Sequence, residues 1–483
     1  QEDLLMKFDE LLFLNSRGKN GVSFTIWDYG GQEVFYTLHH LFLTSYGVYL
    51  LVFDMQQLAK EDCENAQKYI LFWLNSVSLH APDAPILIVG TMMDQLKKRR
   101  DIYNVNEKLM EVIGSGRYSQ IVDNTSEEKQ LMFFPLSNIS GRGIDNIRKS
   151  LENAVKDKDY VNQSIPLKWL YFLHLLQKSP DLKRIFLSDA YLIGRKAGIT
   201  RTEEVNDCLE LFHNLGLIVY LTATQNLRNV VALDPQWLAS ALGRVIRDVK
   251  VHNVDEERLK ESGLSEEYKA LYTSGVATID LLEYLWGGDL SDETDYLLDL
   301  MLTTLLASRW NFNGSSKILI PCLISSVRSR KSVKPRSKGA KSVFMFDFSD
   351  SFLPIGIFER LVCICVAYSS RQDGSREPEL SKTESRIWFG SHMMFLEQQD
   401  NSIFVSIQPQ ECANLCLEIL RSMMRKLKTD IMGENFKWRE MLQIEGEFIS
   451  YEEAKSRETW PWFTDSNLSD KLPSAINLEN FLR

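Results

Sequence analysis

Cysteine is scarce in this sequence, with seven residues among 483 and no Cys-x-x-C pair. This excludes a disulfide framework and a zinc site built on such pairs. Cys363 and Cys365 lie in a strand-like apolar run, and Cys412 and Cys416 share one face of a predicted helix. We interpret both pairs as buried thiols, with metal binding as the less favoured alternative.

Long apolar runs and an excess of positive charge are also missing. The longest nearly apolar run, residues 41–53, is shorter than the ~20 residues that a membrane-spanning helix needs. Lys and Arg total 55 against 65 Asp and Glu, and this net charge of −10 argues against a nucleic-acid-binding protein. No secretory signal is visible at Gln1, so we expect a cytoplasmic location.

What the sequence does contain is enough apolar material for several packed cores. Hydrophobic residues make up 44% and aromatic residues 11% of the chain, which excludes disorder as the main state. The length predicts about two to four domains.

The first 155 residues alternate strand and helix patterns, as parallel α/β sheets do. Residues 11–15 and 22–28 flank a turn and predict a hairpin. Further strands are predicted at 48–53, 85–90 and 131–136, and helices at 62–79 and 143–155. The run 85–90 is apolar on both faces, as central parallel strands are.

The pattern changes after Tyr160. A helix, two strands and a second helix are predicted in turn at 201–215, 217–221, 229–233 and 235–249. This order resembles a winged helix, which normally reads DNA. Because no basic recognition face accompanies it, we interpret the unit as one that packs against protein.

Seven positive charges between Val327 and Lys341 mark a boundary. A solvated loop or linker is favoured over a phosphate-binding or nuclear-import patch, because such a run of like charges cannot bury. Strands are predicted beyond it at 342–347, 361–368, 386–396 and 403–407, and a helix at 412–427. On that helix, Met423 and Met424 either pack in the core or face a second subunit.

Trp27-Asp28-Tyr29-Gly30-Gly31-Gln32-Glu33 lies at the end of the predicted strand 22–28. Asp28 could hold Mg²⁺ through water, and the backbone of Gly31 could approach a γ-phosphate. Gln32 could then orient the attacking water. A solvated glycine-rich turn has the same composition, so this motif alone is a weak signal.

Two more polar segments follow predicted strands. Thr91-Met92-Met93-Asp94 follows strand 85–90, and Asp94 could accept hydrogen bonds from the N1 and N2 edge of guanine. Ser137 and Asn138 begin a loop whose backbone N–H groups could read guanine O6. Segments that follow successive strands fit ligand binding at the carboxyl edge of an open α/β sheet. Together they predict a guanine nucleotide site.

With these motifs in this order, the sequence resembles the Roc and COR domains of Roco proteins. Residues 27–44 are similar to the Roc switch II segment, 233–238 and 352–361 to COR sequences, and 386–397 to the tryptophan-bearing strand of the second COR half. The resemblance implies the α/β class, with a Ras-like parallel-sheet GTPase domain. A two-part α+β COR domain would follow, winged-helix-like in its first half and β-rich in its second.

The resemblance also implies boundaries, ligands and partners. The boundaries are Roc 1–157, first COR half 158–326, linker 327–341, second COR half 342–460 and tail 461–483. GTP or GDP and Mg²⁺ are the implied ligands. A homodimer through COR is implied, with leucine-rich repeats upstream and a kinase or other domain downstream as possible fusions. The implied roles are catalysis for Gln32, nucleotide contact for Gly31, Thr91, Asp94, Ser137 and Asn138, and indirect Mg²⁺ binding for Asp28.

A phosphate loop is the missing part of this pattern. No G-x-x-x-x-G-K-[ST] sequence occurs, and no threonine precedes Thr25 to serve in switch I. We interpret the chain as a Roc domain without its first strand, phosphate loop and switch I. Met92 stands where many GTPases have a lysine, and it keeps an apolar surface for the base.

Two functions stay open. One is a signalling GTPase whose nucleotide state is coupled to COR self-association, and the other is a nucleotide-independent scaffold with an inert GTPase remnant. We expect the isolated chain to act as a scaffold. His39 and His40 either transmit the nucleotide state to COR or are ordinary histidines, and the second interpretation is the more common one. Trp237 and Trp388 are interpreted as core anchors.

Overall fold

The computed structural model of the chain divides into two compact units. Unit 1 comprises residues 1–29, 44–170 and 214–217, and unit 2 comprises 30–43, 171–213 and 218–483. The residues that the structure describes are 24–29, 36–96, 98–114, 118–125, 130–178, 182–247, 256–325, 343–372, 374, 376–408, 413–433, 435–444 and 447–456. The predicted strand 11–15, the basic linker and the tail lie outside them.

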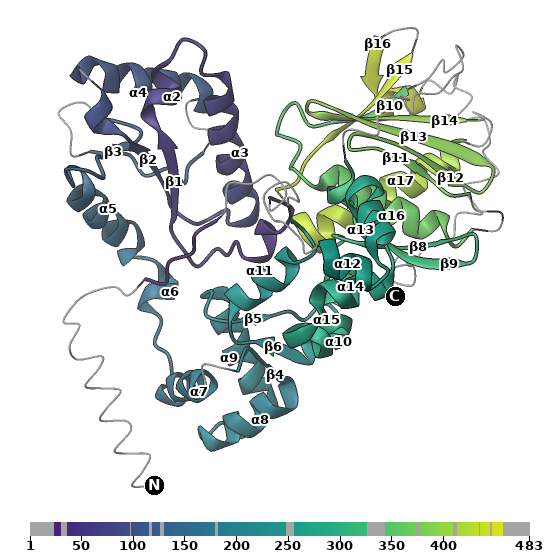
Figure 1. Cartoon of the computed structure of the whole chain (residues 1–483). Coiled ribbons are helices and arrows are strands. Elements are labelled where there is room, and N and C mark those ends of the chain that lie inside the picture. Colours follow the sequence, from purple (N-terminus) through teal and green to yellow (C-terminus); the bar gives the residue numbers. More distant parts are fainter. Residues whose placement is uncertain are drawn as a thin grey trace. The chain divides into compact units, whose positions relative to one another are not determined.

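Unit 1 is built on a parallel sheet of three strands in the order β1-β2-β3 (Figure 1). The strands are β1 (Tyr49–Asp54), β2 (Ile86–Thr91) and β3 (Phe134–Pro135). In the register, Asp54 lies beside Thr91 and Gly90 beside Pro135, so the carboxyl ends of the strands share one edge. The predicted parallel sheet is therefore confirmed.

The third strand is shorter than predicted. The predicted range was 131–136, whereas β3 contains only Phe134 and Pro135. Leu131 forms an antiparallel bridge to Asn124, and Pro135 has no N–H to donate to a neighbouring strand.

Helices cover both faces of this sheet. α3 (Glu64–His80) and α4 (Arg99–Ile113) enclose one core with β1 and β2, and α5 (Ile144–Lys156) packs on the opposite face. The short helix α2 (Met55–Ala59) follows β1 directly, and the Asp54 side chain caps it by accepting from Gln56 N–H. Leu50 and Val52 of the edge strand β1 remain exposed.

Residues 24–29 form no strand, so the prediction of a strand at 22–28 is wrong over its described part. A buried strand would cover its apolar side chains, but Phe24 is exposed and Ile26 is 90% exposed. Trp27 instead lies against Gly216, where an added Cβ would come within 3.3 Å of the indole nitrogen. Tyr29 packs near Trp73, with 6.5 Å between the ring centroids.

The first part of unit 2 has the predicted helix, strand, strand and helix with two additions. α9 (Thr202–Asn214), β5 (Val219–Tyr220), β6 (Val230–Ala232) and α11 (Pro235–Gly243) follow in that order. The additions are the helix α10 (Gln225–Arg228) and the strand β4 (Arg184–Phe186), which gives the sheet order β4-β6-β5. α8 (Leu187–Lys196) precedes α9, and α11 ends at Gly243 rather than at 249.

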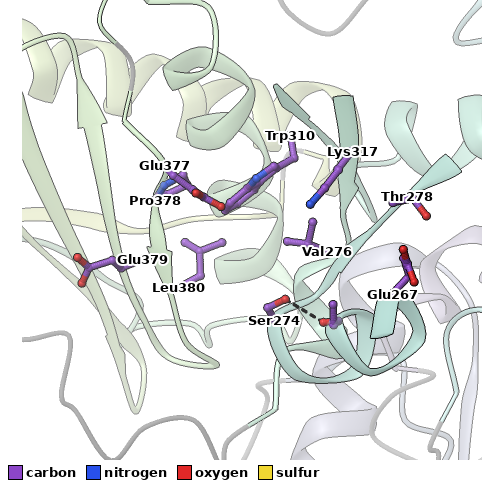
Figure 2. Close-up of a pocket in the computed structure, with 11 residues that line it drawn as sticks. Glu267, Ser274, Val276, Thr278, Trp310, Lys317, Glu377, Pro378, Glu379 and Leu380 are labelled. Carbon is purple, nitrogen blue, oxygen red and sulfur yellow. Dashed lines mark hydrogen bonds between the residues drawn. The ribbon is translucent and has the colours of Figure 1, made fainter. Parts of the chain in front are cut away.

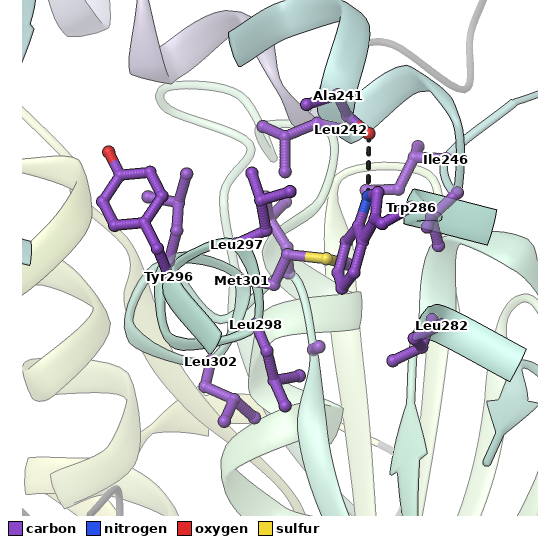
Figure 3. Close-up of a cluster of buried hydrophobic side chains, with 14 of the residues drawn as sticks. Ala241, Leu242, Ile246, Leu282, Trp286, Tyr296, Leu297, Leu298, Met301 and Leu302 are labelled. Carbon is purple, nitrogen blue, oxygen red and sulfur yellow. Dashed lines mark hydrogen bonds between the residues drawn. The ribbon is translucent and has the colours of Figure 1, made fainter. Parts of the chain in front are cut away.

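A second set of elements completes this part around one large core. They are α13 (Ser265–Ser274), β7 (Val276–Ala277), α14 (Ile279–Trp286), α15 (Thr294–Thr303), β8 (Ser308–Phe312), β9 (Ser315–Leu319) and the turn η5 (Pro321–Leu323). Trp286 is fully buried, and its indole N–H donates to the Ala241 carbonyl at 2.9 Å (Figure 3). Trp237 packs against the same core, as expected of an anchor.

The second part of unit 2 is a seven-stranded sheet in the order β11-β12-β13-β14-β10-β15-β16 with antiparallel neighbours. Its strands are β10 (Val343–Asp347), β11 (Glu379–Leu380), β12 (Glu384–Phe389), β13 (His392–Gln399), β14 (Ser402–Gln408), β15 (Arg439–Ile444) and β16 (Glu447–Ser450). Its helices are α16 (Ile357–Ser369), α17 (Ala413–Leu427) and α18 (Tyr451–Ser456).

Two strand predictions in this part are wrong. Residues 361–368 belong to α16, which contacts β8, β12 and α17 and is therefore apolar around most of its circumference. Cys363 and Cys365 are buried thiols of this helix and not of a strand. Residues 386–396 form parts of β12 and β13, joined by a turn in which Gly390 has φ +60°.

Helix α17 has the predicted place, and the structure decides between its two interpretations. Met423 and Met424 are fully buried within unit 2, so they are core residues rather than a surface for a second subunit. Of the helices that the structure describes, none combines the length and apolarity needed to cross a bilayer.

Candidate functional site

The centre of the candidate site is a hydrogen-bonded pair at the carboxyl edge of the unit 1 sheet. Ser137 Oγ donates to Asp94 Oδ1 at 2.6 Å, and Gln95 Nε2 donates to Asp94 Oδ2 at 2.8 Å. These two donors lower the pKa of the Asp94 carboxyl below its ordinary value, the Ser137 bond being the larger cause. Asp94 is exposed while Ser137 is 1% exposed. The site therefore presents an ionised carboxylate whose orientation is fixed by the buried Ser137 hydroxyl.

The loop that carries Asp94 is tied to the neighbouring loop by backbone bonds. Leu136 N–H donates to the Gly90 carbonyl at 2.8 Å, and Met93 N–H donates to the Leu136 carbonyl at 3.1 Å. Between them, Met92 adopts a left-handed conformation with φ 62°, which turns the chain sharply after β2. Asp94 and Ser137 are adjacent because these bonds join the two strand ends.

Thr91, the last residue of β2, has a structural partner. Its hydroxyl donates to the Phe53 carbonyl at 3.0 Å. This bond fastens the end of β2 to the end of β1, and it positions the start of the Asp94 loop.

The Ser137 loop closes on itself before α5 begins. Ser137 N–H donates to the Arg142 carbonyl at 3.0 Å, and Gly141 N–H donates to the Ser137 carbonyl at 2.9 Å. Gly143 then has φ +93°, and a Cβ there would lie 2.3 Å from the Pro135 carbonyl oxygen. Only glycine permits this approach. Asn138 is exposed on the loop.

This arrangement suits recognition of a planar base with adjacent N–H groups. A carboxylate with two oxygens can accept two parallel hydrogen bonds. The side chain of Met92 is exposed next to it and offers apolar area for stacking. The structure brings Thr91, Asp94 and Ser137 together with Asn138 at the rim, and their roles toward a nucleotide stay predictions.

The catalytic part of the predicted site is not assembled among the described residues. Gly31 and Gln32 lie outside them. Asp28 is exposed on a segment without strand structure, and among the described residues no hydrogen bond or ion pair joins it to a partner. The described residues also contain no cluster of three or more His, Cys, Asp or Glu side chains suited to a metal. These residues alone do not make a magnesium site.

The described part of the segment after the motif, residues 36–43, belongs to unit 2 and contains the turn η2 (His39–Leu41). His39 is 7% exposed, and burial lowers its pKa to about 4. His39 is therefore an interior residue, and its role in transmitting the nucleotide state stays a prediction.

A separate cavity of about 490 Å³ lies in unit 2 (Figure 2). Trp310 and Leu380 contribute apolar surface, and Lys317 and Glu267 contribute charge. Glu379, which also lines it, is paired with Arg386 at 2.9 Å. None of the predicted site residues lines this cavity, so it is not the predicted nucleotide site.

Comparison with known proteins matches two stretches of the chain to described domains. Residues 6–94 match "Ras of Complex, Roc, domain of DAPkinase", and residues 166–324 match "C-terminal of Roc, COR-A domain". The class defined by these matches is a Roc domain followed by a COR domain.

Relatives and a solved structure are similar over parts of the chain. "Probable serine/threonine-protein kinase pats1" of Dictyostelium discoideum is 32% identical over 47% of this chain and 7% of its own length. "Leucine-rich repeat serine/threonine-protein kinase 1" of Mus musculus is 21% identical over 76% of this chain and 18% of its own length. The structure titled "Structure of methanosarcina barkeri Roco2 RocCORdC bound to GDP" has 20% identity and a TM-score of 0.43, and the match covers 62% of this chain and 79% of that one.

The Roc and COR-A matches and the Dictyostelium relative support a Roco family protein. The chain spans less than a tenth of the length of these relatives: the match covers 7% of pats1 and 8% of a second Dictyostelium discoideum relative, "Probable serine/threonine-protein kinase roco5".

Proposed function

We propose that this chain is the Roc–COR part of a signalling GTPase, in which GTP binding and hydrolysis are coupled to self-association through COR. The observation that carries the proposal is the Asp94–Ser137 pair at the edge of a parallel sheet. An exposed carboxylate held by a buried hydroxyl is chemically suited to the N1 and N2 edge of guanine.

Within this proposal, each predicted residue has one task. Asp94 accepts hydrogen bonds from guanine, Ser137 orients that carboxylate, and the loop at Asn138 presents backbone N–H groups to the base. Thr91 fixes the start of the Asp94 loop. Gln32 orients the attacking water and Gly31 contacts the γ-phosphate. Mg²⁺ would be held indirectly by Asp28 and would supply charge neutralisation of the phosphates.

A second candidate is a nucleotide-independent dimerisation scaffold. The observation that favours it is the absence of a G-x-x-x-x-G-K-[ST] sequence from the 483 residues. A triphosphate normally receives much of its binding energy from charge-assisted hydrogen bonds in that loop. Without these bonds, we expect this chain alone to bind nucleotide weakly.

The surroundings of the chain are part of the proposal. Relatives named as kinases support a kinase domain in the same polypeptide, and leucine-rich repeats upstream are a further expectation. A cytoplasmic location and a homodimer formed through COR are the remaining parts of the proposal.

The test is a titration with fluorescent GDP and GTP, with Mg²⁺ or with EDTA. It uses this chain and a version extended upstream to any encoded phosphate loop. Asp94→Ala should weaken binding on the order of 100-fold, because two hydrogen bonds to a charged acceptor are lost. Asp145→Ala is the matched control, since Asp145 is also an exposed acid on unit 1.

The outcomes separate the two candidates. Binding by the extended version that is lost in Asp94→Ala but kept in Asp145→Ala supports the GTPase. No binding by either version, together with a dimer in light scattering, supports the scaffold. Equal binding by Asp94→Ala and Asp145→Ala would contradict the assigned guanine site.

A further inference from the structure

The cavity of about 490 Å³ in unit 2 is enclosed by two stretches of chain that are distant in sequence. Its lining comes from α13, β7, β8 and β9 in the first part of the unit, and from residues 377–380, which include β11, in the second part. Asn313 Nδ2 donates to Glu377 Oε2 at 3.2 Å, so a hydrogen bond joins the two parts at the cavity. Ligand sites typically measure about 300–1,000 Å³ and often lie between domains. The cavity is therefore large enough for a small organic molecule.

One wall of the cavity is a face of the small sheet β7-β9-β8. Trp310 on β8 lies directly opposite Lys317 on β9 in the antiparallel register, so their side chains stand next to each other on one face. Figure 2 shows the Lys317 side chain extending from the sheet toward Val276 of β7. Pro378 and Leu380 add apolar surface from the second part of the unit. The cavity thus combines an aromatic wall with aliphatic surface.

Several polar side chains of the lining already have partners in the chain. Ser274 Oγ donates to the Ala270 carbonyl at 2.8 Å, as the dashed line in Figure 2 marks. The Thr278 hydroxyl caps α14. Glu379 is paired with Arg386 at 2.9 Å, and this neutralises its charge. These groups have structural roles and leave little capacity for a ligand.

Two charged side chains of the lining are different. Lys317 and Glu267 are both half-buried, and among the described residues no hydrogen bond or ion pair joins either side chain to the other or to a third residue. A charge that is partly withdrawn from water interacts more strongly with an opposite charge than a fully solvated one does. The cavity therefore offers one cationic and one anionic position, with apolar surface beside them.

We propose that this cavity binds a small zwitterion with an apolar body, of the class of apolar amino acids and their dipeptides. The ligand carboxylate pairs with the Lys317 ammonium, and the ligand ammonium pairs with the Glu267 carboxylate. Such charge-assisted hydrogen bonds are stronger than neutral ones. An apolar or aromatic side chain of the ligand lies against Trp310 and Leu380.

The charges of the lining disfavour a ligand with a single charge. An anion would bring its charge close to Glu267 and Glu377, and a cation would bring its charge close to Lys317. Either ligand would also leave one half-buried charge without a partner after its water is displaced. The proposal goes beyond the proposed function, since none of the predicted nucleotide residues lines the cavity.

The experiment is a titration of this chain with the dipeptide leucyl-phenylalanine. Two derivatives remove one ligand charge each: the N-acetyl form lacks the ammonium, and the C-terminal amide lacks the carboxylate. Free phenylalanine is the fourth probe and distinguishes an amino acid from a dipeptide as the preferred ligand. Binding is measured by calorimetry and by ligand-observed nuclear magnetic resonance, which also detects binding that releases no heat.

Each charged lining residue has a variant and a matched control. Lys317→Met and Glu267→Gln remove one charge and keep most of the side chain. Lys269→Met and Glu266→Gln remove the same charges from exposed positions of α13 that do not line the cavity. Because every variant is titrated with all four probes, each ligand group is tested against each protein group.

The expected result is a specific pairing of ligand groups with protein groups. In the unmodified chain, loss of either ligand charge should weaken binding on the order of tenfold or more, the worth of a hydrogen bond between charged groups. In Lys317→Met the amide should bind as well as the dipeptide, and in Glu267→Gln the N-acetyl form should do so. Lys269→Met and Glu266→Gln should keep both preferences within about threefold, as distant sites do.

Three outcomes would overturn the inference. The first is no saturable binding of the dipeptide or of phenylalanine up to about 10 mM. The second is a singly charged derivative that binds the unmodified chain as well as the dipeptide does. The third is a preference that Lys317→Met and Glu267→Gln leave unchanged, or that the control variants reduce equally.

Discussion

Asp94 in unit 1 and two buried charged residues in unit 2 show two different uses of polar groups. In unit 1, the Asp94 carboxylate is exposed at the edge of a sheet and is oriented by the buried Ser137. In unit 2, Arg360 and Asp347 are themselves buried and are satisfied by their own chain, Asp347 through Ser349 and Arg439. Polar groups that face solvent can receive a ligand, whereas buried ones specify the packing. The difference fits the proposed recognition role of Asp94 in unit 1 and a structural role for Arg360 and Asp347 in unit 2.

The largest expected effect comes from a substitution in the core of unit 2. Trp286→Ala should lower the free energy of unfolding by about 3–5 kcal/mol, because it removes a fully buried indole and leaves a cavity. Trp237→Ala, at a half-buried position on the same core, should cost less. Urea unfolding followed by tryptophan fluorescence and circular dichroism measures both. Equal losses in the two variants would contradict the assigned core.

The next test concerns pH, since unit 2 buries a neutral histidine. His39 has a pKa of about 4 when folded against an ordinary value of 6.5, so the unfolded chain binds a proton first as the pH falls. Stability should therefore decline between pH 6.5 and about pH 4, by about 3 kcal/mol in total from this group.

The matched variant for this test is His39→Gln, which removes the titration. Its stability should depend less steeply on pH over the same interval, as measured by urea unfolding at half-unit steps. Parallel pH profiles for the two proteins would show that His39 is not a buried neutral group.

Two glycines of unit 1 can be compared, because both have a positive φ but only one of them is crowded. Gly143→Ala should cost about 1–3 kcal/mol or more, because it combines a positive φ with a Cβ pressed against the Pro135 carbonyl. Gly141→Ala also has a positive φ but meets no atom within 4 Å, so it should cost about 1–2 kcal/mol at most. Thermal unfolding compares them. If Gly141→Ala were the more damaging, the described loop geometry would be wrong.

The smallest expected effect comes from the bond that orients Asp94. Ser137→Ala removes the 2.6 Å hydrogen bond but keeps the carboxylate, so nucleotide affinity should fall by about tenfold or less. Ser140→Ala, in the same loop, is the control and should change affinity little. A complete loss of binding in Ser137→Ala would mean that the hydroxyl contacts the ligand directly.

Sequence patterns predicted the unit 1 sheet better than unit 2. The strand at 85–90 and the adjacency of Asp94 and Ser137 follow from apolar runs and from parallel topology, which depend on local sequence. The prediction of a strand at 361–368 was wrong because α16 is covered by β8, β12 and α17. A helix that is buried on all sides lacks the alternation of apolar and polar residues that would identify it as a helix. The bond between Arg360 and Thr37 joins residues 323 positions apart, and no local pattern could have indicated it.

The most direct test of the central claim is a change of base specificity. In Asp94→Asn, the side-chain amide can donate to the carbonyl that xanthine carries where guanine has its amino group. The account predicts that the extended protein loses GDP binding and gains xanthosine diphosphate binding, each on the order of 100-fold, in the same titration. An Asp94→Asn variant that keeps its GDP affinity and ignores the xanthine nucleotide would contradict the guanine site and, with it, the GTPase assignment.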